Sequence, residues 1–162
     1  PNPTKAPWYF ACIQELLLHF HPLFALFIIP VLMLVGLVSI PYIRYQTETA
    51  GVWFASHRGR RMAQVAAMTA VIISPLGIIA DEFVIDFAAG MPNMSPVVRN
   101  GILPAAFVLV GIIVFYWLVK KKYAATNNES IQSVFVLLVV ALIILTITGI
   151  WFRGKGMALI WP

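Results

Sequence analysis

The chain carries three histidines, and their spacing limits the chemistry they can do. A haem held across a helix bundle needs two histidines on facing helices at matched depth. His19 and His21 lie two positions apart, so on a helix their side chains diverge by about 200°. His57 lies in a polar loop. We therefore expect that this chain does not ligate haem by itself. An imidazole at a membrane boundary can relay protons, although capping a helix or facing lipid headgroups is the commoner role.

Carboxylates stand at two places that could handle protons. Glu15 lies in the N-terminal segment, whereas Asp81, Glu82 and Asp86 follow an apolar stretch. The second group could lead protons outward or attract a cationic protein partner; simple hydration of a loop is the alternative. The single Cys12 excludes an internal disulfide, and no Cys/His spacing typical of a metal site occurs.

The composition indicates that lipid surrounds most of the chain. Of 162 residues, 61% are hydrophobic and 10% charged, against about 25% charged in soluble domains. Crossing a hydrocarbon core of about 30 Å takes about 20 apolar residues in a helix. Four stretches without Asp, Glu, Lys or Arg meet this requirement: Leu23–Ile43, Met62–Ala80, Gly101–Val119 and Ile131–Phe152. We expect an all-α membrane protein, because unpaired backbone groups exclude isolated strands in lipid.

Basic residues predict the orientation of these spans. Seven of them lie in the two loops that four spans would place on one membrane face: Arg44, Arg58, Arg60, Arg61, Lys120, Lys121 and Lys122. Four lie on the other face: Lys5, Arg99, Arg153 and Lys155. The positive-inside rule makes the first face cytoplasmic, which explains the net charge of +5 without nucleic acid. Arg153 is interpreted either as a contact for a partner subunit or as a membrane anchor.

The chain is expected to form one membrane domain over residues 1–162. Residues 1–21 comprise a Pro-rich loop and a short amphipathic helix over Trp8–Phe20, and residues 22–162 comprise the four spans and a tail. Pro30 and Pro75 are expected to kink their helices by removing a backbone hydrogen bond.

The N-terminal segment carries a recognisable pattern. Lys5-Ala6-Pro7-Trp8-Tyr9-Phe10, followed by Gln14-Glu15-Leu16, resembles the Pro-Glu-Trp-Tyr-Phe motif of the C-terminal half of cytochrome b from bc-type quinol:cytochrome c oxidoreductases. The first span with Pro30, its end at Ile40-Pro41-Tyr42-Ile43, and the tail Phe152-Arg153-Gly154 with Gly156, Trp161 and Pro162 are similar to bacterial menaquinol members. The resemblance covers residues 1–43 and 146–162.

The resemblance implies a haem-free subunit of a split complex in the bacterial cytoplasmic membrane. Pro7, Trp8, Tyr9 and Phe10 would line the outer quinol-oxidation (Qo) site, with menaquinone as the quinone. The implied partners are a cytochrome b-like chain with two b haems, a Rieske iron–sulfur protein and a c-type cytochrome, in a dimeric complex that adds to the proton gradient. The N-terminal motif and the C-terminus would face outward.

The chain departs from the family in three respects. Pro7 stands where the motif carboxylate usually is, so we expect Glu15, with His19 or His21, to accept the proton there. The spanning helix that precedes the motif in the family must come from elsewhere, and four spans follow the motif where the mitochondrial type has three. The second and third spans are interpreted as a lineage-specific addition.

The alternative is a non-catalytic membrane scaffold or a small transporter subunit. A transporter normally buries charged residues at mid-membrane, and the four predicted spans contain none. A scaffold would leave the Pro-rich aromatic segment unexplained.

Overall fold

The computed structural model describes residues 5–39, 42, 56–85 and 90–160. The regular secondary structure in these residues is helical, apart from an isolated bridge between Arg153 and Leu159. The all-α prediction is therefore confirmed for the described part of the chain.

Three helices are long and apolar enough to cross a membrane. They comprise α3 (His57–Phe83), α5 (Leu103–Tyr123) with the π-helical turn Val98–Ile102 before it, and α6 (Asn127–Ile147) with the π-helical turn Thr148–Phe152 after it. Each begins or ends several residues beyond the apolar stretch that predicts it, because its terminal turns continue into polar sequence. The chain is thus a multi-pass membrane protein.

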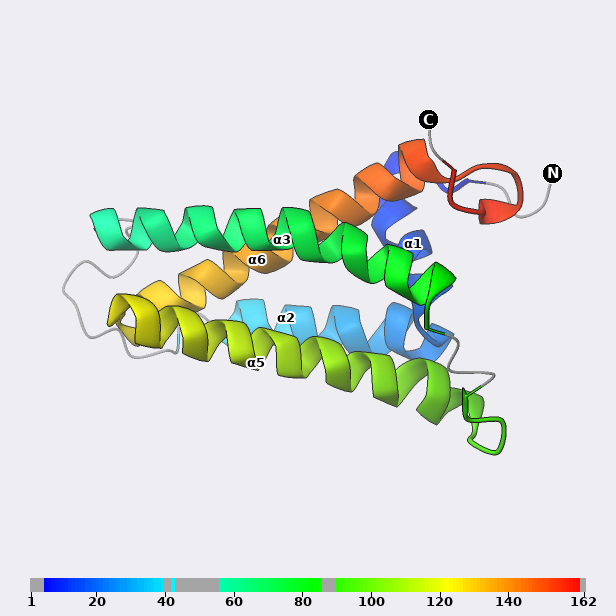
Figure 1. The fold of residues 1–162 in the computed structure, drawn as a ribbon, viewed down its shortest axis with the longest axis horizontal. Helices are drawn as coiled ribbons and strands as arrows, with labels where there is room; N and C mark the ends of the chain where they lie inside the picture. The colour runs from blue at the N-terminus through cyan, green and yellow to red at the C-terminus, as the bar shows by residue number, and fades with distance from the viewer. Residues whose placement is uncertain (1–4, 40–41, 43–55, 86–89, 161–162) are drawn as a thin grey trace.

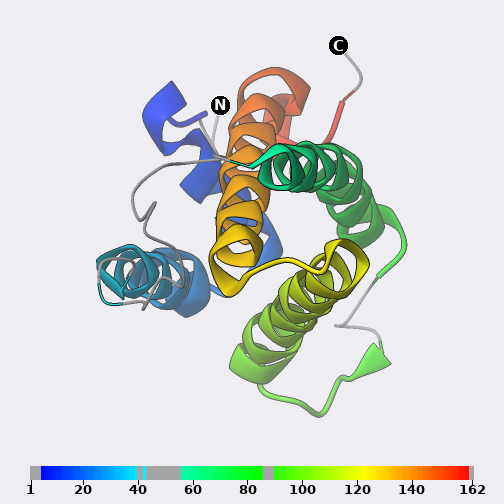
Figure 2. The ribbon, with the colours of Figure 1, turned by 90° about the vertical axis from the view of Figure 1, so that its left-hand side faces the viewer.

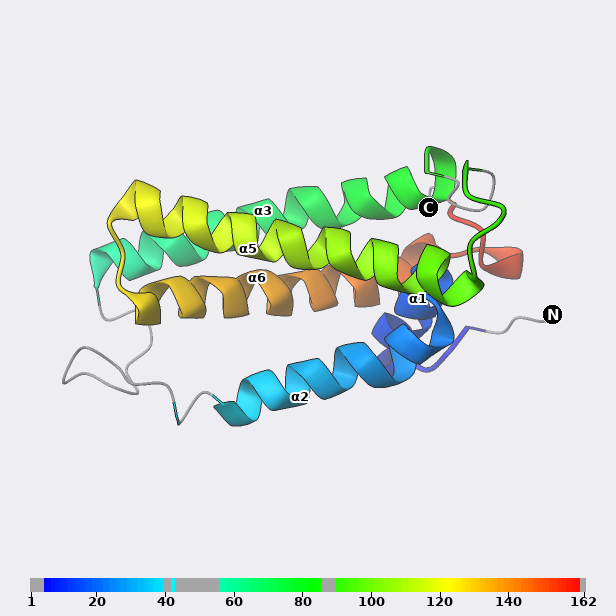
Figure 3. The same ribbon diagram turned by 90° about the horizontal axis from the view of Figure 1, so that it is seen from below.

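The first predicted span, Leu23–Ile43, is described only in part. A π-helical turn at Phe24–Ile28 continues into α2 (Ile29–Ser39), and together they form an apolar helix shorter than the other three. Residues 40, 41 and 43 lie outside the described residues, so a fourth span stays a prediction. Figures 2 and 3 show α2 standing apart from the other long helices, and none of its residues is buried.

The N-terminal segment forms the expected short helix in two parts. A 3₁₀ turn spans Trp8–Phe10 (η1), and α1 follows over Ala11–His19. Ala11 and Glu15 are the residues that α1 buries, while Leu17 and Leu18 are exposed. That the helix is amphipathic stays a prediction.

Helix α6 occupies the centre of the bundle. Viewed along the helices, α3 and α5 lie on one side of it and α2 on another (Figure 2). Ala66 of α3 is fully buried and Ala70 nearly so, and α3 packs closely along α6, as small side chains allow between membrane helices. Phe115 and Val119 of α5 complete this core with Met62 and Ala125.

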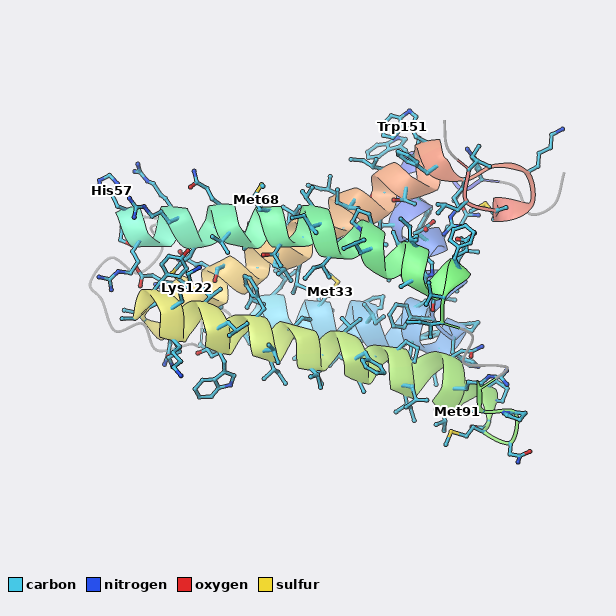
Figure 4. All side chains as sticks on the ribbon, viewed as in Figure 1. Met33, His57, Met68, Met91, Lys122 and Trp151 are labelled. Atoms are coloured by element: carbon cyan, nitrogen blue, oxygen red, sulfur yellow. The ribbon has the colours of Figure 1, made fainter. Side chains whose placement is uncertain are left out.

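The two ends of the bundle differ in charge. At one end Arg58 donates through Nη1 to the carbonyl of Ala124 at 3.1 Å, so the start of α3 meets the turn between α5 and α6. Figure 4 places His57 and Lys122 together at this end. We call it the basic end: its described cations are Arg58, Arg60, Arg61, Lys120, Lys121 and Lys122. The predicted pairing of these two segments is confirmed; Arg44 lies outside the described residues.

The opposite end, which we call the network end, carries α1 and the C-terminal tail over residues 153–160 (Figure 1). The three π-helical turns of the described residues lie here, at the start of α2, at the start of α5 and at the end of α6 (Figures 1 and 3). Pro30 is the second residue of α2, two positions beyond the end of the first of them. Pro75 lies inside α3, which stays helical but bends in its second half (Figure 1).

Candidate functional site

The motif segment is tied to the end of α6 and to α1. Lys5 donates through Nζ to the carbonyl of Ile150 at 3.0 Å, and the Ala6 N–H donates to Oε1 of Gln14 at 2.6 Å. The Phe10 N–H donates to the carbonyl of Pro7 at 2.9 Å, which closes the 3₁₀ turn. Proline suits this entry, because its ring holds φ near the observed −53°.

Three aromatic rings project from this turn. Trp8, Tyr9 and Phe10 are 72%, 56% and 52% exposed. Trp8 and Tyr9 meet edge to face with ring centroids 5.7 Å apart, and Tyr9 and Phe10 are tilted at 5.1 Å. The three rings contact one another and leave their outer faces uncovered. Such a surface suits a flat apolar ligand or an apolar face of another protein.

Helix α1 holds this aromatic turn against α6 by a close backbone approach. A Cβ atom built on Gly149 would lie 3.0 Å from the carbonyl oxygen of Ala11 and 3.3 Å from its Cβ. Ala11 is 2% exposed. Any Cβ atom at this position would be in tight contact with the backbone of α1, so the small size of glycine favours the observed position of α1.

The centre of the network end is a buried guanidinium. Arg153 is 1% exposed and Glu15 is 0% exposed. Arg153 donates to Glu15 through Nη2, at 2.6 Å from Oε1, and through Nε, at 3.2 and 3.1 Å from the two carboxylate oxygens. Its Nη1 donates to Glu82 and, at 3.0 Å, to the carbonyl of Met157. A forked guanidinium is suited to bridging two carboxylates in this way.

His19 joins the same cluster from the next turn of α1. Its Nδ1 lies 2.6 Å from Oδ2 of Asp81. Its Nε2 lies 3.2 Å from Oε1 of Glu15 and 3.3 Å from Nη2 of Arg153. We call Glu15, His19, Asp81, Glu82 and Arg153 the ion network; it links α1, the end of α3 and the C-terminal tail.

The charges of the network set its protonation. Burial would raise the pKa of Glu15, but hydrogen bonds from His19 and Arg153 outweigh it and hold the pKa below its ordinary value. Burial would lower the pKa of His19, but the hydrogen bonds and charges of Asp81 and Glu15 raise it to about 9. At neutral pH the cluster therefore holds a carboxylate on Glu15 and an imidazolium on His19.

The C-terminal tail folds back to present Arg153. The Ile160 N–H donates to the carbonyl of Phe152 at 2.8 Å, and the Gly154 N–H donates to that of Ala158 at 2.9 Å. Gly156 has φ +71° in the turn between them, a conformation that glycine adopts without strain. The Leu159 N–H donates to Oε1 of Glu82 at 2.9 Å, so the tail is fastened to α3 as well.

The structure brings together most of the predicted site residues. Trp8, Tyr9 and Phe10 form the exposed surface, and Pro7 directly precedes them. Glu15 is buried on α1, the helix that follows this turn. His21 lies outside the ion network; its Nδ1 accepts from the N–H of Leu23 at 3.3 Å. Asp86 lies outside the described residues.

Two sequence interpretations were wrong. Arg153 is neither an exposed anchor nor free for a partner subunit, because its side chain is enclosed by its own chain. Asp81 and Glu82 are not merely hydrated, since each bonds inside the ion network. The only sequence signal for this cluster was the spacing of four between Glu15 and His19, which puts both on one face of α1.

Comparison of the chain with protein families, with curated proteins and with solved structures found no match.

Proposed function

We propose that this chain is the haem-free C-terminal cytochrome b-like subunit of a split bc-type quinol:cytochrome c oxidoreductase. In this proposal it contributes one wall of the outer Qo site, and a separate cytochrome b-like chain completes the site. The membrane is a bacterial cytoplasmic membrane, the network end faces outward, and the quinone is menaquinone.

The observation that carries the proposal is the exposed aromatic turn at one end of a membrane bundle. Trp8, Tyr9 and Phe10 leave more than half of their surfaces uncovered by this chain, so these surfaces are open to a ligand or a partner. The turn is held from behind by Lys5, by Pro7 and by the contact between Ala11 and Gly149. A fixed apolar wall with an open outer side is what a quinone ring requires of one half of its pocket.

The ion network supports a proton route beside this wall. Glu15 is ionised at neutral pH, so it is in the state that accepts a proton. His19 bridges Glu15 and Asp81, and the Asp81 side chain is 31% exposed. In the proposal, Glu15 takes up a proton released at the aromatic wall and the imidazolium of His19 gives its Nδ1 proton to Asp81, which releases it outward, so the network ends with the number of protons it began with. This route replaces the motif carboxylate whose position Pro7 occupies.

Partner chains would supply the redox groups. In the proposed complex, b haems in the cytochrome b-like chain and the iron–sulfur cluster of a Rieske protein take the two electrons of quinol, and a c-type cytochrome receives one of them afterwards. This chain contributes a surface, a proton route and helices, and its redox function depends on those partners. The complex is proposed to be dimeric.

A non-catalytic scaffold or small transporter subunit remains the second candidate. Helix α2 favours a scaffold, because none of its residues is buried and it can pack against another chain. In the described residues of the long helices, charged groups lie at the ends rather than at mid-membrane, which disfavours a transporter. A scaffold would use the aromatic turn only as an apolar contact for another protein, which leaves the order of the Pro-rich aromatic motif unexplained.

Co-purification tests the proposal against the scaffold. The full chain carries an affinity tag after Pro162 and is isolated in mild detergent from its native membrane. We expect a stoichiometric b-type absorption spectrum after dithionite reduction and the electron paramagnetic resonance signal of a Rieske cluster. The mock purification from the untagged strain is the control. Stoichiometric isolation with other membrane proteins but without haem or iron–sulfur signals would exclude the proposed subunit and favour the scaffold.

A further inference from the structure

An open groove lies on α3 close to the basic end, far from the aromatic turn. Its volume is about 350 Å³. Six residues of α3 and one of α5 line it: Arg61, Gln64, Val65, Met68, Thr69, Ile72 and Tyr123. The polar members lie mainly toward the start of α3, and the rest of the lining is apolar. The groove therefore has a positive charge at the end near Arg61 and a mainly apolar lining along the rest of its length.

The dimensions of the groove match one leaflet of a membrane. Arg61 and Ile72 are eleven positions apart on α3, which corresponds to about 16 Å at 1.5 Å per residue. Half of a hydrocarbon core of about 30 Å is nearly the same length. Because α3 is a membrane span that begins at His57, Arg61 lies near the headgroups and Ile72 near the bilayer centre.

Arg61 is the cation that lines the groove. Its side chain is exposed and forms no ion pair within the described residues. Its neighbour Arg58 donates to the carbonyl of Ala124. Lys120 donates to Oδ1 of Asn127 at 2.6 Å and lies over the rings of Tyr116 and Trp117. Tyr123, whose ring carries a hydroxyl group, lines the same groove as Arg61. Lys122 Nζ lies 5.7 Å from the centroid of the Tyr123 ring.

We propose that this groove binds an anionic phospholipid, with its phosphate at Arg61 and Tyr123 and one acyl chain along Val65, Met68 and Ile72. The proposal does not depend on quinol chemistry. It commits to a lipid rather than a free anion because the lining below Arg61 is apolar, and to an anionic lipid because the mouth carries an unpaired guanidinium among further cations.

A second groove provides an internal contrast. It has a volume of about 290 Å³ and lies between α5 and α6, lined by Ile112, Ile113, Tyr116, Trp117, Ile131 and Val134. No cation lines it, and the nearby Lys120 is occupied by Asn127. We expect this groove to hold acyl chains without preference for the headgroup, so that charge selectivity belongs to the first groove.

Native mass spectrometry of the full chain in detergent tests the proposal, with added phosphatidylglycerol or phosphatidylcholine of equal chain length. Arg61→Gln should weaken phosphatidylglycerol binding about fivefold, since one basic residue near a headgroup contributes about 1 kcal/mol. Lys121→Gln removes the same charge from an exposed residue outside the groove and is the matched control; its effect should be less than twofold. Phosphatidylcholine binding should be the same for both variants.

A second variant tests whether the apolar part of the groove binds the acyl chain. Thr69→Trp fills the middle of the groove without changing charge, and it should weaken binding of both lipids by severalfold. Unchanged thermal unfolding midpoints would show that both groove variants fold. Equal losses for Arg61→Gln and Lys121→Gln would overturn the proposal in favour of general charge attraction. Unchanged binding by Thr69→Trp, or equal binding of both lipids by the unmodified chain, would overturn it as well.

Discussion

At the scale of single residues, the enclosed Arg153 organises the network end. Two cations, Arg153 and protonated His19, face three carboxylates, those of Glu15, Asp81 and Glu82. Taking a guanidinium out of water costs several kcal/mol, and the cost is offset only when the charge is paired and fully hydrogen-bonded. In the described residues no buried polar side-chain atom lacks a partner. Removing one member of the ion network would leave another buried charge unpaired, which typically lowers the free energy of unfolding by about 3–5 kcal/mol.

His19 makes the stability of the chain depend on pH. Its pKa rises from 6.5 in the unfolded chain to about 9 in the folded one, so the folded state binds its proton more tightly. The resulting stabilisation is complete below about pH 6.5 and is lost as pH rises through about 9. We expect the thermal unfolding midpoint in detergent to fall over this window, by an amount equivalent to at most about 3 kcal/mol.

His19→Gln should remove that part of the pH dependence. His57→Gln is the control, because His57 is exposed and lies at the basic end. A fall in the unfolding midpoint that persists unchanged in His19→Gln would show that the imidazole carries no stabilising proton in this window.

The sequence predicted some of these residues and not others. The aromatic trio and Glu15 stood out because their types and order resemble a known motif. Arg153 could not be placed, because an arginine directly after an apolar stretch is usually a headgroup anchor. Its partners Glu15 and Glu82 lie 138 and 71 positions away, and no periodicity in the sequence relates positions so distant.

At the scale of secondary-structure elements, α1 and α6 form the contact on which the aromatic turn rests. The contact is close because Gly149 has no side chain, and the π-helical turn Thr148–Phe152 continues α6 into this region. A Cβ atom at position 149 requires a shift of at least a few tenths of an ångström between α1 and α6, and a larger side chain is expected to move α1 and Trp8–Phe10 further.

Gly149→Val is therefore expected to separate α1 from α6 and to destabilise the chain by about 1–3 kcal/mol, the usual cost of overpacking. Cys12 is the one cysteine of the chain and is half-buried on α1 beside Ala11. Its rate of labelling by a maleimide should rise severalfold in Gly149→Val.

Gly111→Val is the matched control for this experiment. A Cβ atom on Gly111 would meet nothing within 4 Å, so neither the unfolding midpoint nor Cys12 labelling should change appreciably. Equal labelling rates in Gly149→Val and in the unmodified chain would contradict the proposed role of the contact.

Hydropathy located α3, α5 and α6 because each contains a long uncharged run, but their ends extend further than the run itself. Thr126 and Glu129 form a capping box at the start of α6, a signal that the apolar stretch beginning at Ile131 does not include. The π-helical turns had no sequence signal, since they reflect packing at the network end rather than local composition.

At the scale of the whole molecule, the bundle has two dissimilar ends. The pairing of the basic loops was predictable because hydrophobic spans must alternate in direction across a membrane. The pairing at the other end was not, because it depends on which side chains meet when α1 and the tail fold over α3. The result is a basic end suited to lipid headgroups and a network end that fixes an aromatic surface.

In the proposed function, Trp8 and Tyr9 form a wall of a quinol-oxidation site. The most direct test of this role is the rate of menaquinol analogue oxidation by the purified complex carrying Trp8→Ala and Tyr9→Ala together. Trp151→Ala is the control: Trp151 is similarly exposed, at 59%, and projects outward at the network end. We expect at least a tenfold loss of turnover in the double variant at unchanged haem and iron–sulfur content, and near-normal turnover in Trp151→Ala. Normal turnover in the double variant would contradict this role.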